Sequence, residues 1–246
     1  GATDIYTYKA EGVIELEYPV PNPEPIAKVL HGLREDERLD ILHVDNGNPS
    51  IVAENLEPAT EITRTLVETL SDGAVLSFGL ESADPRVHEE NWLNCDSEQL
   101  KTAIRHINEH GRERGERGLP KLLPGLNFIA GLNGETEQSY SLNRQLLHSL
   151  RAEGLWLRRI NIRQVEGQGF QPIPEDTFRA FKKSVREEID KPLLEEMFPA
   201  GTRLTNVWWE AHDDRIRRPE QVLNPEHRDP VAQESPSVVK SEHTQS

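Results

Sequence analysis

Short apolar runs alternate along most of the chain with stretches in which apolar residues recur at helical spacing. Four runs have the length and the leucine-rich or β-branched content of buried strands: residues 39–44, 74–78, 126–129 and 157–165. Four stretches carry an apolar stripe on one helical face: residues 26–33, 58–70, 96–107 and 136–153. This alternation of strand and helix predicts right-handed βαβ crossovers, and therefore an α/β fold with parallel strands.

Turn and capping residues mark most of the predicted boundaries. The prolines between Pro19 and Pro25 predict that regular structure begins only after them, because proline lacks an amide hydrogen and restricts the residue before it. The sequence Asp-Asn-Gly-Asn-Pro at 45–49 is typical of a turn, and residues 79–82 are expected to form the exit loop of the second strand. Asp96 and Gln99 have the spacing of a helix capping box.

The pattern changes after Gly167. It predicts two helices, over 177–189 and 193–198, broken at Pro192, and one more strand over 204–209. From about residue 215 the chain is polar and has few large apolar groups, which predicts a disordered tail. We therefore divide the chain into a (β/α) core over 1–167, a helical extension with a short strand over 168–214, and a tail over 215–246.

Each predicted strand has one apolar row and one row that carries polar residues, because side chains alternate between the two faces of a strand. The polar rows contain His43, Asp45, Ser77, Glu81, Asn127, Asn161 and Arg163. A barrel interior is normally filled by branched apolar residues, so these rows indicate a binding site. The simpler interpretation is that each polar group is satisfied by a neighbour or by water.

The stretch 119–135 contains the clearest local signal for a ligand. A short buried strand runs into a loop with Gly131 and Gly134, and an acidic helix start follows at Glu135 and Glu137. Glycine lets backbone N–H groups approach a ligand, and α/β proteins usually bind ligands at this end of a strand. Such a loop also occurs where the chain only turns, so its meaning depends on the neighbouring strands.

Charge and cysteine content exclude several classes of function. A formal net charge of −15 disfavours non-specific binding to nucleic acid or anionic membranes. Arginine outnumbers lysine among the 28 basic residues, which fits a halophile-like surface and equally an ordinary solvated one. The single cysteine, Cys95, excludes an internal disulfide and a cysteine-held metal cluster. No stretch is apolar enough to span a membrane and no signal peptide is evident, which predicts a cytoplasmic protein.

Four segments are distinctive in combination: Leu-Ser-Phe-Gly-Leu-Glu-Ser-Ala-Asp-Pro-Arg-Val (76–87), Pro-Gly-Leu-Asn-Phe-Ile-Ala-Gly-Leu-Asn-Gly-Glu-Thr (124–136), Arg-Arg-Ile-Asn-Ile-Arg-Gln-Val (158–165) and His-Val-Asp-Asn-Gly-Asn-Pro (43–49). Together they resemble the later part of the core of radical S-adenosylmethionine (radical SAM) enzymes. The resemblance covers about residues 3–214 and is nearest to archaeal and other prokaryotic members. It implies a partial, TIM-barrel-like (β/α) barrel with S-adenosylmethionine across the carboxyl ends of its strands.

The resemblance also implies roles for individual residues. The residues that it places on S-adenosylmethionine are Glu81, Ser82, Asn127, Ile129, Gly131, Asn161 and Arg163. Of these, Glu81 and Ser82 match the motif that contacts the ribose and the methionine part, and Arg163 is suited to pair with a carboxylate. The substrate-side candidates are His43, Asp45 and Asn46. The chain departs from the family where Asn127 replaces a common glycine and Asn133 a common proline.

A larger departure concerns the iron–sulfur cluster. Radical SAM chemistry needs a Cys-x-x-x-Cys-x-x-Cys loop to hold a 4Fe-4S cluster, and this chain contains only Cys95. The resemblance therefore implies that the first two βα units lie outside this sequence. Since the first residue is Gly1, we expect a fragment or processed product that is inactive alone. An unpaired strand edge would then favour poor solubility, partial folding or pairing with a partner chain.

Two other interpretations remain open at this point. The first is a non-catalytic protein, which would be either a degenerate remnant of the fold or a subunit completed by a partner chain. The second is an aldolase-like TIM-barrel enzyme. His212-Asp213-Asp214 could bind a metal, although a solvated charged run explains it more simply. Trp208 and Trp209 form either a partner-binding patch or part of the final strand.

Overall fold

The structure is a computed structural model that describes residues 4–116, 118–165 and 175–198, all within the first of two compact units of the chain, residues 1–203. Its elements in chain order are η1 (Ile5–Thr7), α1 (Pro23–Arg34), β1 (Asn46–Gly47), α2 (Pro49–Glu54), α3 (Leu56–Thr69), β2 (Ala74–Glu81), α4 (Pro85–Asn91), α5 (Ser97–Gly111), β3 (Leu122–Ala130), α6 (Glu137–Ala152), β4 (Arg159–Gln164), α7 (Glu175–Val185), the π-helical turn η2 (Arg186–Asp190) and α8 (Lys191–Met197).

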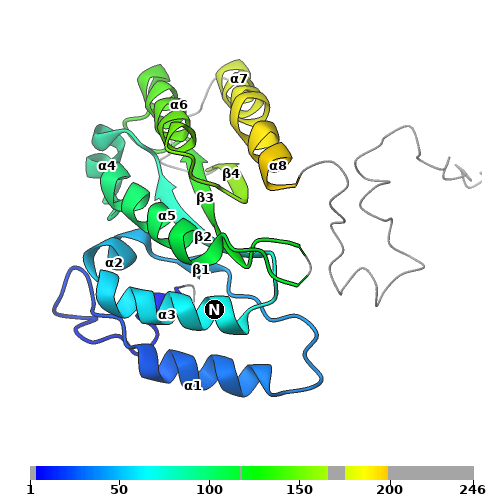
Figure 1. The fold of residues 1–246 in the computed structure, drawn as a ribbon. Coiled ribbons are helices and arrows are strands. Elements are labelled where there is room, and N and C mark those ends of the chain that lie inside the picture. Colours follow the sequence, from blue (N-terminus) through cyan, green and yellow to red (C-terminus); the bar gives the residue numbers. More distant parts are fainter. Residues whose placement is uncertain (1–3, 117, 166–174, 199–246) are drawn as a thin grey trace, which may run out of the picture. The chain divides into compact units, whose positions relative to one another are not determined.

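The four strands form one parallel sheet in the order β1-β2-β3-β4 (Figure 1). Each crossover moves the chain one strand further in the same direction. Because such crossovers are right-handed, this order places the connecting helices α3, α5 and α6 on the same face of the sheet. The predicted α/β fold with parallel strands is therefore confirmed. None of these three connecting helices covers the other face of the sheet.

Apolar rows of the strands and the helices form a single hydrophobic core. Leu76, Phe78 and Leu80 of β2 are buried, as are Leu126 and Phe128 of β3. The core face predicted for the helix after Asp96 is confirmed, since every member of its apolar stripe is fully buried in α5. Further along the chain, α7 packs against the same core through Phe181, whose ring lies 6.3 Å from that of Phe128 and 5.1 Å from that of Tyr140.

The first predicted strand is wrong in its position. Residues 39–44 run beside β2 but form only isolated backbone hydrogen bonds, such as that from Ser71 N to Leu42 O at 3.1 Å. The paired residues are Asn46 and Gly47, inside the predicted turn. The turn signal has a different cause, because the side-chain oxygen of Asn48 accepts from Ser50 N at 3.0 Å and so caps α2.

The helix starts that were predicted from the positions of prolines are partly wrong. Helix α1 begins at Pro23, not after Pro25, since the amide groups of a first helical turn have no partner within the helix and a proline there loses nothing. The short helices α2 and α4 were not predicted, although each begins with a proline after a capping Asn48 or Asp84. Helix α3 starts at Leu56, two residues before the expected Pro58.

Two further predictions are corrected by the structure. Strand β2 continues through Glu81, where an exit loop over 79–82 was expected. The expected break at Pro192 is replaced by the π-helical turn η2, which joins α7 directly to α8. The predicted strand 204–209, the pair Trp208–Trp209, the cluster His212-Asp213-Asp214 and the tail from 215 lie outside the described residues.

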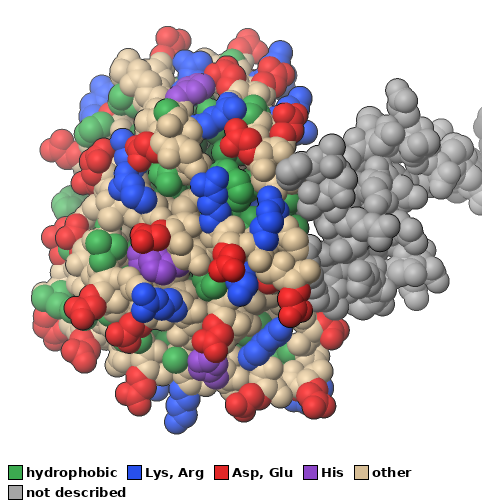
Figure 2. All heavy atoms as spheres, in the orientation of Figure 1, with side chains coloured by type: hydrophobic (Ala, Val, Ile, Leu, Met, Phe, Trp, Pro, Cys, Tyr) green, Lys and Arg blue, Asp and Glu red, His purple; other side chains and the backbone are tan. Residues whose placement is uncertain are grey.

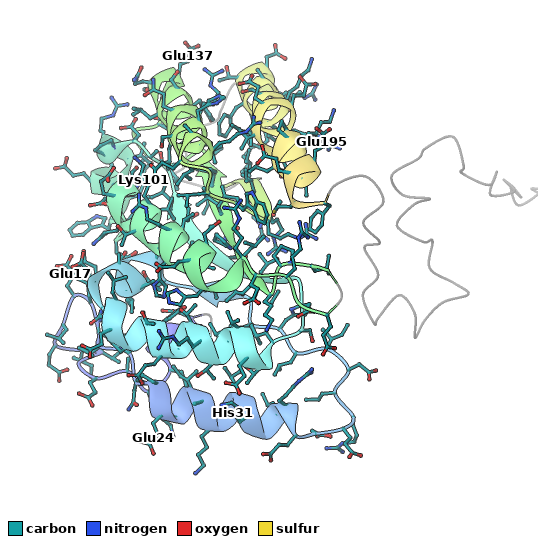
Figure 3. All side chains as sticks on the ribbon, viewed as in Figure 1. Glu17, Glu24, His31, Lys101, Glu137 and Glu195 are labelled. Atoms are coloured by element: carbon teal, nitrogen blue, oxygen red, sulfur yellow. The ribbon has the colours of Figure 1, made fainter. Side chains whose placement is uncertain are left out.

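Charged side chains cover the outer surfaces of the helices. The exposed residues labelled in Figure 3 include Glu24 and His31 of α1, Glu137 of α6 and Glu195 of α8. Acidic and basic side chains are interspersed over the face in Figure 2. Within the described residues, no helix is long and apolar enough to cross a membrane.

Candidate functional site

The polar rows of neighbouring strands lie in register on the sheet face opposite the apolar core rows. Ser77, Gly125 and Arg159 are register partners on β2, β3 and β4, and Asn46 of β1 is opposite Ser77. The next row toward the carboxyl end contains Gly79, Asn127 and Asn161. Ile129 and Arg163 form a further row on the same face. We call this face, defined by the rows of Ser77, Asn127 and Ile129, the open face.

Glu81 is the most unusual residue of this open face. Its φ is +68°, in the left-handed region, and the register between β2 and β3 shifts between Gly79 and Glu81. The carboxylate folds back over Gly79, where a Cβ atom would collide with Glu81 Oε1. A glycine at 79 is therefore required for this side-chain position.

One oxygen of the Glu81 carboxylate lacks a hydrogen-bond partner in the part of the chain that the structure describes. This atom, Oε2, is buried. Burial raises the pKa of Glu81 to about 7, and the nearby positive charge of Arg163 opposes this shift only in part. Arg163 itself is exposed and makes no hydrogen bond within the described part of the chain. An unsatisfied carboxylate beside a free guanidinium is typical of a binding site.

Asn127 and Asn161 form an amide pair next to Glu81. Asn161 Nδ2 donates to Asn127 Oδ1 at 2.8 Å. This bond leaves the Asn127 amide as a donor and the Asn161 carbonyl oxygen as an acceptor, neither with a partner in the described residues. One donor beside one acceptor matches the edge of a nucleobase, and the pair lies one row from Arg163.

Arg159 also reaches the open face, although the sequence did not single it out as a site residue. Its Nη2 donates to Ser77 Oγ at 2.9 Å and lies 3.5 Å from Asp45 Oδ1. The guanidinium of a β4 residue thus contacts β2 and the segment before β1. The only sequence signal was its place in the same strand row as Asn161 and Arg163.

Two residues predicted to bind the cofactor are engaged by the protein itself. Ser82 is fully buried, and its hydroxyl accepts from Asp84 N at 3.2 Å. Gly131 has φ +93°, and its N–H donates to Glu135 Oε2 at 2.5 Å. The expectation that this amide would be free for a ligand is therefore corrected: Glu135 bends back from the loop, and helix α6 starts only at Glu137.

Glu135 belongs to a network that fixes both loops at the carboxyl ends of β2 and β3. Tyr140 donates its hydroxyl to Glu135 Oε2 at 3.1 Å, and burial raises the pKa of Glu135. Ser139 Oγ donates to Asp84 Oδ2 at 2.6 Å, and Asn143 Oδ1 accepts from Ala83 N at 2.6 Å. These bonds tie the β2–α4 turn to the first turns of α6, so the residues around Glu81 have a rigid support.

The three substrate-side candidates are placed differently from one another. His43 is an exposed residue of the segment before β1 and makes no hydrogen bond to described residues. Asp45 forms an ion pair with Arg159, with 3.5 Å between Oδ1 and Nη2. Asn46 belongs to β1 and helps to line a pocket of about 180 Å³ with apolar residues that include Val29 and Val44. The structure thus brings Asp45 to Arg159 and pairs Asn46 with Ser77, whereas His43 makes no hydrogen bond to the described open-face residues.

The cysteine is buried, although the charge of Glu81 still acts on its thiol. Cys95 is buried just before α5, where burial raises its thiol pKa to about 12 and its Sγ–H donates to Asp96 O at 3.3 Å. A protonated buried thiol is a poor metal ligand. Among the described residues, no group of three His, Cys, Asp or Glu side chains is arranged to hold a metal ion.

Comparisons with known proteins find archaeal relatives. The chain is 39% identical over 218 residues to an uncharacterized protein of Archaeoglobus fulgidus, a match that covers 83% of this chain and 40% of the relative. It is 36% identical over 219 residues to an uncharacterized protein of Methanocaldococcus jannaschii, covering 85% of this chain and 40% of that protein. The chain thus spans about 40% of the length of these relatives. No protein-family model matches it.

Proposed function

We propose that this chain forms part of the wall of a radical SAM (β/α) barrel and that its open face binds S-adenosylmethionine. The sequence resemblance over residues 76–87, 124–136 and 158–165 supports this assignment. The strand order supports it as well, because sequential parallel strands with helices on one face are the geometry of a barrel wall. In a barrel, the open face would become the lumen.

The observation that carries the proposal is the unsatisfied Glu81 carboxylate beside Arg163. S-adenosylmethionine offers ribose hydroxyls and an ammonium group as donors, and its carboxylate needs a cation. Glu81 would accept from these donors, and Arg163 would pair with the carboxylate. Asn127 and Asn161 would recognise the edge of the adenine through their free amide groups.

The residues present do not fit a 4Fe-4S cluster. Such a cluster needs cysteine thiolates, and this chain has one cysteine, which is buried. In the proposed protein the cluster would be held by polypeptide outside residues 1–246. The activity expected of this chain by itself is therefore binding of S-adenosylmethionine without its cleavage.

Isothermal titration calorimetry with S-adenosylmethionine tests the proposal on the full chain. Glu81→Gln should weaken binding by about tenfold to a hundredfold at pH 8, since a hydrogen bond to a charged acceptor is lost. The matched control is Glu24→Gln on the outer surface of α1, which should bind like the parent. Equal affinity of the parent and Glu81→Gln for S-adenosylmethionine would refute the site.

Adenosine separates the two halves of the site. It lacks the amino-acid part, so its affinity should be unaffected by Arg163→Gln, whereas S-adenosylmethionine should bind this variant less tightly. A variant that weakens both ligands equally would contradict the assignment of Arg163 to the carboxylate.

A partner-completed subunit is the second candidate, and one feature favours it. Strand β1 pairs on one side only within the described residues, and the pocket beside it has a mainly apolar lining that includes Ile5, Val29 and Val44. An apolar pocket at a sheet edge suits an added strand.

The aldolase-like alternative of the Schiff-base type has no support, because none of the four strands contains a lysine.

A further inference from the structure

The open face contains a second cationic position besides Arg163. We propose that Arg159 forms a subsite for the carboxylate or phosphate group of an anionic substrate. The inference rests on the proposed function in one respect, namely that the open face is the face that meets small molecules. It adds a substrate class to that function and involves residues other than those assigned to S-adenosylmethionine.

Arg159 reaches its position because Gly125 leaves room for it. The two residues are register partners, so the Arg159 side chain must pass over β3 to reach Ser77 on β2. A Cβ atom at 125 would lie 3.0 Å from Val75 Cγ1 and 3.2 Å from Ser77 Oγ. It would therefore crowd the hydroxyl that receives the Arg159 bond. Ser77 is 2% exposed, which makes it a fixed anchor for the guanidinium.

Most of the guanidinium remains available after this contact. Only Nη2 has partners, whereas Nε and Nη1 make no hydrogen bond within the described part of the chain. The Arg159 side chain is 48% exposed although it lies on a sheet face. A guanidinium presents several donors in one plane, and this fork matches the oxygens of a carboxylate or phosphate.

Asp45 holds Arg159 only weakly. The distance from Nη2 to Asp45 Oδ1 is 3.5 Å, longer than the roughly 2.7–2.9 Å of a charge-assisted hydrogen bond. The Asp45 side chain is 78% exposed, and ion pairs with such an exposed partner contribute little. Asp45 thus lies where a ligand anion would bind, and we expect such an anion to displace it.

The local charge of the open face differs from that of the chain. The net charge of −15 repels anions at long range. Strand β4 nevertheless presents Arg159 and Arg163 on one face, four residues and therefore about 13 Å apart along the strand. This separation allows an anion at Arg159 and a cofactor carboxylate at Arg163 to bind together.

Inorganic phosphate, titrated into the full chain at constant ionic strength and followed by amide NMR shifts, tests the proposal. We expect shifts at Ser77, Gly125 and Arg159. Asp45→Asn removes the internal competitor and should tighten phosphate binding by up to about fivefold, the factor that corresponds to a weak ion pair. Arg159→Gln should abolish the shifts, and Arg159→Lys, which keeps the charge but loses the fork, should weaken them.

The control is another exposed aspartate–arginine pair. Asp36 pairs with Arg38 at 2.6 Å in an exposed segment, so Asp36→Asn should leave phosphate binding unchanged. The subsite is wrong if Asp45→Asn leaves phosphate affinity unchanged or lowers it, if Arg159→Gln binds phosphate like the parent, or if no shifts occur near Gly125. Binding of S-adenosylmethionine to Arg159→Gln separates this failure from failure of the proposed function, because that variant should retain the cofactor.

Discussion

Glu81 combines two features that each cost stability. A non-glycine residue in the left-handed region costs roughly 1–2 kcal/mol. A buried carboxylate oxygen without a donor adds a desolvation cost. Both costs arise at the end of β2, where the register shift turns the carboxylate back over Gly79. Strain and an unsatisfied charge in one residue favour a functional role over a purely structural one.

The pH dependence of stability should report the state of Glu81. Its pKa is raised from 4.5 to about 7, so the folded state holds a proton that the unfolded state releases between these values. The Glu81 contribution to stability is therefore complete below pH 4.5 and is lost as the pH rises through 7. Glu81→Gln should match the parent in urea unfolding at pH 4 and exceed it by about 1–2 kcal/mol at pH 8, after allowance for partial exposure. A parent that is as stable as Glu81→Gln at pH 8 would contradict this assignment.

The open-face rows follow from the sequence because strand side chains alternate with a period of two, whatever the tertiary contacts. That rule grouped Asn161 with Arg163 correctly. It could not find the role of Arg159, which depends on the register of β4 against Gly125 and Ser77. It also missed Glu135, whose carboxylate returns to Gly131 instead of starting the helix.

At the scale of elements, α5 provides a clear test of local sequence signals. The Asp96 side chain accepts from Glu98 N and Gln99 N, both at 2.8 Å, and Gln99 Oε1 accepts from Asp96 N at 3.1 Å. Asp96→Ala should lower the free energy of unfolding by about 1 kcal/mol in urea titration, because two helical amides lose their acceptor. Asn22 precedes α1 without a side-chain cap bond, so Asn22→Ala is the matched control and should cost much less. Equal losses in the two variants would show that capping does not stabilise α5.

The alternation of strands and helices was predictable because each element buries one face, and the spacing of apolar residues records that face. The errors fall mostly at prolines. Pro23 was placed in an irregular stretch before the first helix and Pro49 in a turn, yet each occupies a first helical turn. The local sequence allows both outcomes, and the packing of α1 against α3 and of α2 against α5 decides between them.

At the scale of the molecule, the described residues form an open four-stranded sheet with two edge strands. Strands β2 and β3 are paired on both sides, whereas β1 and β4 are each paired on one side. The central strands also supply fully buried residues, such as Phe78 and Leu126. Strand β1 has only two residues, so it adds little pairing of its own. Further polypeptide that completed a barrel would have to pair with these two edge strands.

Hydrogen exchange of the backbone amides tests whether these two edges are covered. For a wall with open edges, amides of β2 and β3 should exchange through global unfolding, while those of Asn46 and of β4 should exchange far faster through local opening. Mass spectrometry of the full chain at two protein concentrations is the measurement. Protection of β1 that rises with concentration would show that a second copy covers the edge. Edge amides that are as protected as those of β3 at every concentration would contradict the open wall, because a covered edge implies a further strand.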